Sequence, residues 1–181
     1  MEQYQYDYPH PAVTTDCVVF GYDGLRLHVL LIERGEGPYT GCWALPGGYL
    51  NIDEDARDGA LRELMEETHL SLTNIEQLGA FTAPDRDPRE RVISIAYFTL
   101  THLHDVHGDD DARQAKWFPI TELPELAFDH MDIFNTALKR MSDYLKLKTG
   151  NFFSDSFSYE EIDEIYFATL SKLSTNNIQS K

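Results

Sequence analysis

The sequence predicts an α/β fold in which helices cover a mixed β-sheet. The first observation is a run of apolar, β-prone stretches interrupted by a strongly helical, acidic segment. The second is another segment with helical periodicity that follows the last of these stretches. The order strands, helix, strands, helix is typical of a layered α/β domain. The length of 181 residues fits one domain with a short appendage.

Two strands and a hairpin open the predicted sheet. Residues 12–21 and 25–33 are rich in Val, Leu and Ile, and Asp23-Gly24 between them is a strong hairpin signal. A glycine-rich loop then leads into a short extended piece at residues 43–46. These segments predict the part of the sheet that comes before the helix.

The first predicted helix covers about residues 54–69. Asp53 is the expected N-cap, and the acidic residues of the first turn are favourable beside the positive end of the helix dipole. The remaining elements follow from β-propensity and helical periodicity. They are strands at residues 73–82, 90–103 and 115–120 and helices at 129–147 and about 158–173, before a frayed end.

The chain is strongly acidic. Its 31 Asp and Glu residues against 15 Lys and Arg give a formal net charge of −16. Phosphate backbones are held by Lys and Arg, so this balance argues against a nucleic-acid partner bound across a broad surface. Cys17 and Cys42 are too few for a disulfide framework, and no apolar run approaches the ~20 residues of a membrane helix. We therefore expect a cytoplasmic protein with no membrane partner.

Three glutamates of the first predicted helix fall on one face. Glu63, Glu66 and Glu67 have the spacing i, i+3 and i+4, at which like charges repel by roughly a few tenths of a kcal/mol a pair. A divalent cation would offset this repulsion, because carboxylate oxygens suit Mg²⁺ or Mn²⁺. The alternative is an ordinary acidic face in contact with water. Arg62 among the acids, and a glycine pair just upstream, favour the cation site.

The stretch from residue 47 to residue 70 resembles the box of the Nudix hydrolase family. The family pattern is Gly, five residues, Glu, seven residues, and then Arg-Glu-apolar-x-Glu-Glu-x-Gly-apolar. Here it reads Gly48, five residues, Glu54, seven residues and Arg62-Glu63-Leu64-Met65-Glu66-Glu67-Thr68-His69-Leu70. In element order the resemblance covers about residues 12–145. It implies a Nudix α/β/α sandwich with a mixed sheet over residues 1–148, followed by a short helical extension over 149–181.

The resemblance also implies a chemistry, namely Mg²⁺-dependent cleavage of the pyrophosphate in a nucleoside diphosphate linked to another group. Carried onto this chain, the metal ligands are the carboxylates of Glu63, Glu66 and Glu67 with the backbone of Gly48, braced by Arg62 and Glu54. The general base stays open between a glutamate of the box and one of the later acids Asp109, Asp110 and Asp111.

His69 is the single departure from the family pattern, which has Gly there. Glycine at this place usually serves as a left-handed helix cap, a conformation that His tolerates better than most residues. We expect a small stability cost and an intact metal site.

A basic turn follows the box. Pro84, with Arg86, Arg89 and Arg91, resembles the segment after the box in ADP-ribose pyrophosphatase-like Nudix proteins, which have Pro about one position later. These arginines are expected to contact phosphate, since a guanidinium can donate two parallel hydrogen bonds to it. Surface ion pairs at the entry to a strand are the alternative.

Two more side chains are expected to contact the substrate. Arg34 in the first loop is a second candidate for a phosphate, and Trp43 could stack on a base. For Trp43, packing in the core or at the rim is an equal alternative. The run His102, His104 and His107 could suggest a metal site, but no further ligand stands at clear spacing, so surface histidines are predicted.

The last part of the chain resembles the region in which Nudix-related transcription regulators pass from the Nudix domain into a winged helix. Residues 146–181 reach roughly one helix of such a module and carry four Lys, no Arg and five acidic residues, a poor composition for phosphate contacts. A complete winged helix is not expected, so this resemblance points to ancestry.

The first predicted function is hydrolysis of ADP-ribose to AMP and ribose 5-phosphate. A non-catalytic sensor of ADP-ribose or a sugar metabolite, related to the regulators, is the alternative from another class. A hydrolase of a different nucleotide sugar or of a nucleoside triphosphate is the third. The oligomeric state stays open: the strand at 90–103 or the N-terminal Tyr-rich arm could pair two subunits into a homodimer, and no residue decides it.

Overall fold

A seven-stranded mixed sheet forms the centre of the fold. The structure is a computed structural model that describes residues 7–108, 112–147 and 152–179, with side chains up to residue 176. Its strand order is β3–β2–β1–β6–β5, with β4 beside β1 and β7 beside β2. The strands are β1 (Ala12–Tyr22), β2 (Leu27–Arg34), β3 (Trp43–Ala44), β4 (Gly47–Tyr49), β5 (Glu76–Phe81), β6 (Val92–His102) and β7 (Ala112–Pro119).

The pairing of β1 organises the sheet. It lies parallel to β6 over its whole length, from Ala12 opposite Val92 to Tyr22 opposite His102, while its pairs with β2 and β4 are antiparallel. The β1–β2 hairpin turns at the predicted Asp23-Gly24, where Gly24 has a φ of 87°. A central strand buried on both faces explains the unbroken apolar run that predicted it.

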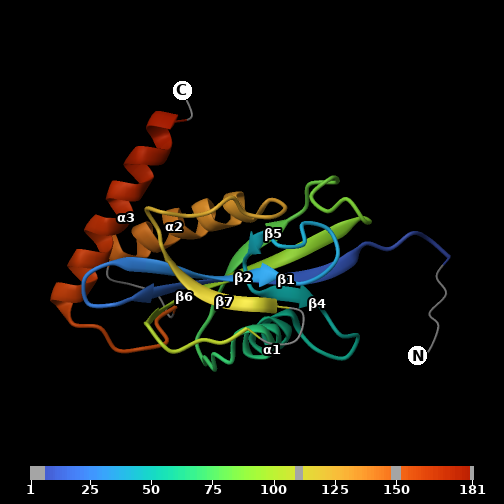
Figure 1. Cartoon of the computed structure of the whole chain (residues 1–181), viewed down its shortest axis with the longest axis horizontal. Coiled ribbons are helices and arrows are strands. Elements are labelled where there is room, and N and C mark those ends of the chain that lie inside the picture. The colour runs from blue at the N-terminus through green and yellow to red at the C-terminus, as the bar shows by residue number, and fades with distance from the viewer. Residues whose placement is uncertain (1–6, 109–111, 148–151, 180–181) are drawn as a thin grey trace.

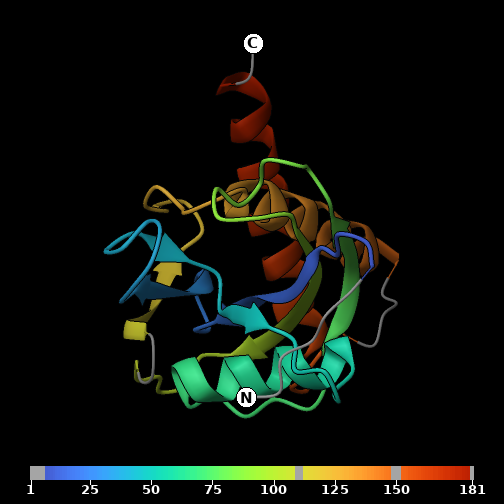
Figure 2. The same cartoon turned by 90° about the vertical axis from the view of Figure 1, so that its right-hand side faces the viewer.

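Helices cover both faces of this sheet (Figures 1 and 2). On one face α1 (Ala56–Thr68) buries Ala60 and Leu64 against Val19 of β1. On the other face α2 (His130–Leu147) packs into the main hydrophobic cluster. The last helix, α3 (Tyr159–Gln179), contacts α2 and projects beyond it. The α/β sandwich and its mixed sheet are therefore as predicted.

Helix boundaries differ from the predicted ones in two places. The expected N-cap at Asp53 is wrong, because the carboxylate of Asp55 accepts the backbone N–H groups of Arg57 and Asp58 and α1 begins at Ala56. Several acidic residues before a helix compete for this role, and only the chain path decides among them. At the other end α3 continues to Gln179, so the expected fraying after residue 173 is also wrong.

The C-terminal extension shares the core of the main body. Phe152 and Ile165 are fully buried in the same cluster as Phe98 and Phe134. Phe153 also forms a bridge with Leu100 at the end of β6. A domain boundary at residue 148 stays a prediction. The expected arm residues Tyr4 and Tyr6 lie outside the described residues.

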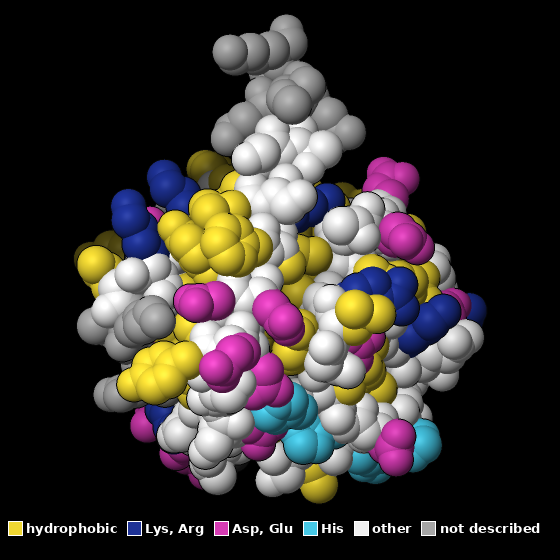
Figure 3. Space-filling view, turned by 90° about the vertical axis from the view of Figure 1, so that its left-hand side faces the viewer, with side chains coloured by type: hydrophobic (Ala, Val, Ile, Leu, Met, Phe, Trp, Pro, Cys, Tyr) yellow, Lys and Arg dark blue, Asp and Glu magenta, His cyan; other side chains and the backbone are white. Residues whose placement is uncertain are grey.

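The face crossed by α3 carries the predicted surface histidines (Figure 3). His102 approaches Glu161 at 3.2 Å and Asp155 at 3.5 Å, and His104 approaches Asp155 at 3.3 Å. These contacts tie the start of the extension to the end of β6. Among the described helices, none has the length and apolar character needed to cross a membrane.

Candidate active site

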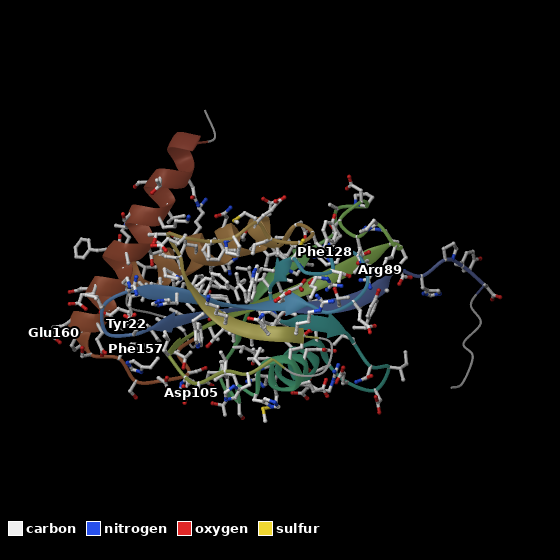
Figure 4. All side chains as sticks on the ribbon, in the orientation of Figure 1. Tyr22, Arg89, Asp105, Phe128, Phe157 and Glu160 are labelled. Atoms are coloured by element: carbon white, nitrogen blue, oxygen red, sulfur yellow. The ribbon has the colours of Figure 1, made fainter. Side chains whose placement is uncertain are left out.

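A cavity of about 320 Å³ opens where β1, β4 and α1 meet the turn before β6 and the start of α2. It lies at one end of the sheet, where Figure 4 shows Arg89 and Phe128, away from Tyr22 and Phe157 at the opposite end. The glutamate face of α1 forms one wall, and the arginine-bearing turn with Phe128 forms another. Residues of β2 and the loop after it also line the cavity, so the fold brings together residues from six separate parts of the sequence.

Arg62 organises the acidic face of α1. Its Nη1 atom donates to Glu63 at 2.8 Å and to Glu66 at 2.9 Å, and its other nitrogens donate to both carboxylate oxygens of Glu54. The hydrogen bonds from Arg62 hold the pKa of Glu54 down at about 2. Arg62 also donates to the carbonyl of Tyr49 at 3.1 Å, which ties α1 to the end of β4. This arrangement gives Arg62 and Glu54 the geometry of bracing residues.

Glu67 and Glu63 lie against the glycine pair of β4. Glu67 is buried and accepts the N–H of Gly47 at 2.8 Å, and burial raises the pKa of Glu67 to about 8. Burial also raises the pKa of Glu63. A Cβ atom on Gly48 would lie 2.5 Å from the Glu63 carboxyl carbon, so only glycine lets this backbone approach so closely.

These carboxylates have the chemistry of a hard-cation site but are engaged with Arg62 and Gly47. Among the described residues, no group of three His, Cys, Asp or Glu side chains is arranged to hold a metal ion. The same Nη1 atom of Arg62 donates to both Glu63 and Glu66. A cation would compete with Arg62 for the same oxygens.

Arg34 and Arg89 carry the positive charge of the opposite wall. The Arg34 guanidinium lies 4.9 Å from the centre of the Phe128 ring, and that of Arg89 lies 6.0 Å from the same ring. Arg34 donates to the carbonyls of Glu36 and Pro38, which leave its charge available to an anion. Burial and the nearby Arg89 lower the pKa of Arg34. Because Arg89 is paired with Asp87, Arg34 is the guanidinium of this wall that has no carboxylate partner among the described residues.

Arg86 occupies a different place from its neighbours in the turn. Its side chain is 4 % exposed and donates two hydrogen bonds to Asp129, at 3.0 and 2.7 Å. It also donates one to Asp16 at 3.4 Å. Arg89 in turn pairs with Asp87 at 2.7 Å. Arg86 therefore anchors the turn to β1 and to the start of α2, and its expected contact with phosphate stays a prediction.

Two other expected substrate contacts lie away from the cavity wall. Trp43 packs edge-on against Phe118, with ring centres 4.6 Å apart. Arg91 donates to the carbonyls of Ala83 and Val92. Their roles toward a substrate stay predictions. The acids Asp109, Asp110 and Asp111 lie outside the described residues.

His69 caps α1 in the left-handed conformation that was expected of it. Its φ is 57°, and its backbone N–H donates to the carbonyl of Met65 at 2.9 Å. The position therefore keeps the cap geometry that glycine usually supplies. The expected intact metal site stays a prediction.

Sequence reasoning missed Phe128, His130 and Asp16, all of which line the cavity. Phe128 has a φ of 52° and packs edge-on against Tyr39 at 4.7 Å. Asp16 and His130 are buried beneath the turn. A lone Asp inside an apolar strand was the one available signal, because a buried charge needs a partner.

Comparison with known proteins agrees with this geometry. The NUDIX domain family matches residues 10–137. An ADP-ribose pyrophosphatase of Methanocaldococcus jannaschii is 38% identical over 79% of this chain and 78% of the relative. The ADPR responsive transcriptional repressor NtrR of Acinetobacter baylyi is 32% identical over 79% of this chain and 60% of the repressor.

Solved structures give the same result. A MutT/nudix family protein from Enterococcus faecalis has a TM-score of 0.80 at 30% identity, over 93% of this chain and 77% of that one. The NUDIX domain of Shewanella oneidensis NrtR, solved with ADP ribose, has a TM-score of 0.69 at 32% identity, over 75% of this chain and 94% of that one.

The fold, the glutamate-rich box at residues 48–70 and the relatives together define a Nudix pyrophosphohydrolase. This chain belongs to the Nudix family. Within that family it is related both to an ADP-ribose pyrophosphatase and to the NtrR and NrtR regulators.

Proposed function

We propose that this protein hydrolyses ADP-ribose to AMP and ribose 5-phosphate with Mg²⁺ or Mn²⁺. The observation that carries the proposal is one cavity with two walls of opposite charge. One wall is the glutamate face of α1 against Gly47 and Gly48, and the other holds Arg34 and Arg89 around Phe128. A diphosphate needs cations on both sides, supplied by metal at the first wall and by arginine at the second.

The metal would be held by Glu63, Glu66 and Glu67, with the Gly48 backbone beside them. The donor set fits a hard cation, because it offers only carboxylate and carbonyl oxygens. When bound, such a metal neutralises diphosphate oxygens and lowers the pKa of a water. Arg62 holds Glu63 and Glu66 in position, and in the absence of a cation its charge balances theirs.

The second wall binds and orients the substrate. Arg34 pairs with a diphosphate oxygen, because its charge faces the cavity without a carboxylate partner among the described residues. Phe128 offers an aromatic face to the base. Arg86 holds the turn in place through Asp129 and Asp16, and so fixes where Arg89 stands.

Hydrolysis joins water to one phosphorus and releases the other phosphate with the bridging oxygen. The proton from water passes to a general base, which is a box glutamate or one of Asp109, Asp110 and Asp111. Single Asn substitutions at Asp109, Asp110 and Asp111 test the later acids, because loss of the base lowers kcat about 10²- to 10⁴-fold.

The test is AMP release from ADP-ribose with Mg²⁺, read by chromatography. Glu66→Gln removes one proposed ligand and is expected to abolish most turnover. Asp58→Asn is the matched control, because Asp58 is an exposed acid of the same helix outside the proposed site. Equal rates in Glu66→Gln and the wild type would contradict the metal assignment.

A panel of substrates separates ADP-ribose from the other nucleotides. It includes a second nucleotide sugar and a nucleoside triphosphate, with ADP-ribose expected to have the highest kcat/KM. Higher kcat/KM for either competitor would move the protein to that substrate class. No turnover of any of them would refute the enzyme proposal.

A sensor of ADP-ribose is the second candidate function, favoured by the similarity to the NtrR repressor and to the ADP ribose complex of NrtR. It predicts tight binding of ADP-ribose without turnover. A gel shift with duplex DNA at low salt is expected to show no complex, given the net charge of −16.

We further propose a cytoplasmic homodimer, for which sedimentation would give twice the mass of one chain.

A further inference from the structure

We propose that His130 is a positioning residue for the metal-binding end of the cavity, acting through the backbone of residues 45–48. This inference rests on the proposed function only in taking Glu63, Glu66 and Glu67 as the cation ligands. His130 lines the same cavity but forms its hydrogen bond with Leu45 and faces Asp16, and it has no hydrogen bond or ion pair with these glutamates.

The first step is the protonation form of the imidazole ring. The backbone N–H of Leu45 donates to Nδ1 of His130 at 2.9 Å, so Nδ1 carries no proton. Nε2 then carries it and faces Oδ1 of Asp16 at 3.4 Å. Asp16 is itself fixed by Arg86 at 3.4 Å and by the hydroxyl of Ser94. The ring is thus fixed at Nδ1 by a hydrogen bond and faces Asp16 with Nε2, in a site where His130 is 4 % exposed.

The second step is the backbone that follows Leu45. The carbonyl of Pro46 accepts the N–H of Cys17 at 2.9 Å. The N–H of Gly47 donates to Glu67 at 2.8 Å. A Cβ on Gly47 would lie 2.0 Å from the carbonyl oxygen of Thr15, so this glycine already touches β1. Leu45, Pro46 and Gly47 thus each have a backbone contact with another part of the fold, so a shift of Leu45 changes the backbone position of the residues beside the glutamates.

The third step connects the histidine to the carboxylates. Leu45 and Gly47 are two residues apart, while His130 and Leu45 are separated by 85 positions in sequence. The Leu45–His130 bond is therefore one of the long-range contacts that fix this segment, beside those with β1 and Glu67, and it fixes the end opposite to the one that orients Glu67 and leaves space for Glu63. Loss of the Nδ1 acceptor leaves a buried N–H unpaired and frees the segment to move. The glutamates lose their alignment, and cation affinity falls.

Two substitutions separate the two ring nitrogens. In His130→Asn the amide oxygen takes about the place of Nδ1 and can still accept from Leu45. In His130→Gln the amide nitrogen takes about the place of Nε2 and can still donate to Asp16, but nothing accepts from Leu45. His28→Gln is the matched control, because His28 is also buried, at 5 % exposed, and lies outside the cavity.

The measurement is Mn²⁺ binding to the full chain without substrate, from the electron paramagnetic resonance signal of free Mn²⁺. We expect the dissociation constant to rise about 10-fold or more in His130→Gln, the usual effect of losing a residue that supports metal ligands. Asn at residue 130, and Gln at residue 28, are expected to stay within about 3-fold of the wild type.

Equal Mn²⁺ affinity in all variants would overturn the inference, and so would equal losses in both His130 variants. Circular dichroism confirms that each variant is folded at the assay temperature. If His130→Gln is unfolded, the Asn variant decides: a loss of about 10-fold there refutes the role of Nδ1. Absence of Mn²⁺ binding by the wild type would instead refute the proposed metal site, and with it this inference.

Discussion

Replacing Gly47 and Gly48 one at a time separates stability from metal binding. In Gly47→Ala the new Cβ would lie 2.0 Å from the Thr15 carbonyl oxygen and 2.9 Å from Asp16 Cα, both in the buried backbone of β1. The residue also has a φ of 156°, which L side chains rarely adopt. Nothing on either side can move cheaply, so we expect unfolding to become easier by about 3–6 kcal/mol, from strain and overpacking together.

In Gly48→Ala the obstacle is the flexible end of a side chain. The Cβ would lie 2.5 Å from the Glu63 carboxyl carbon, which must retreat by about 0.9 Å to reach an ordinary contact of 3.4 Å. A rotation of Glu63 absorbs this at about 1 kcal/mol or less. The displaced carboxylate no longer fits the cation, since sites tolerate only about 0.5 Å. We therefore expect Mn²⁺ affinity to fall about 10-fold.

Thermal unfolding and Mn²⁺ titration together read out both effects. For a chain of this length about 2–4 °C of melting temperature corresponds to 1 kcal/mol, so Gly47→Ala is expected to melt roughly 6–24 °C lower. Gly48→Ala is expected to melt within about 4 °C of the wild type. The reasoning fails if Gly47→Ala is as stable as the wild type, or if Gly48→Ala binds Mn²⁺ normally.

Three more predictions follow from buried groups. Without metal, Glu67 holds a proton up to its pKa of about 8, so Mn²⁺ binding at pH 7 should release up to one proton and should become tighter as the pH rises from 6 to 8. Calorimetry in buffers of different ionisation enthalpy measures the number of protons released. Glu67→Gln should remove the release that comes from this group. Arg86→Met leaves Asp129 without its partner and should cost about 3–5 kcal/mol in urea unfolding, and a cost below about 1 kcal/mol would contradict its role as anchor of the turn. Phe152→Ala should cost about 3–5 kcal/mol, against about 0.5 kcal/mol or less for the exposed Phe167→Ala, and equal losses would contradict the shared core.

Local patterns were sufficient for the strands, the α1 face and the His69 cap. Those features depend on residues within a few positions of one another, as in the i, i+3 and i+4 spacing of Glu63, Glu66 and Glu67. The partners of Arg86 could not be found this way, because Asp129 and Asp16 lie 43 and 70 residues away in sequence. A basic turn in isolation looks like a phosphate site whether its guanidinium groups are free or paired.

The same limit applies to the end of the chain. The sequence pattern predicted the helix α3. It did not predict that Phe152 before this helix and Ile165 within it complete the core of the main body. Helix ends are fixed by caps and packing, which explains why Asp55 and not Asp53 caps α1 and why α3 runs to Gln179.

The placement of α3 has a practical consequence for protein engineering. Its far end points away from the body, while the cavity opens at the other end of the sheet (Figures 1 and 4). A reporter, an affinity handle or a surface tether joined after Gln179 would stand clear of the cavity mouth. Replacing α3 by such a fusion would instead remove Ile165 from the core. Fusions should therefore be added to this helix and never substituted for it.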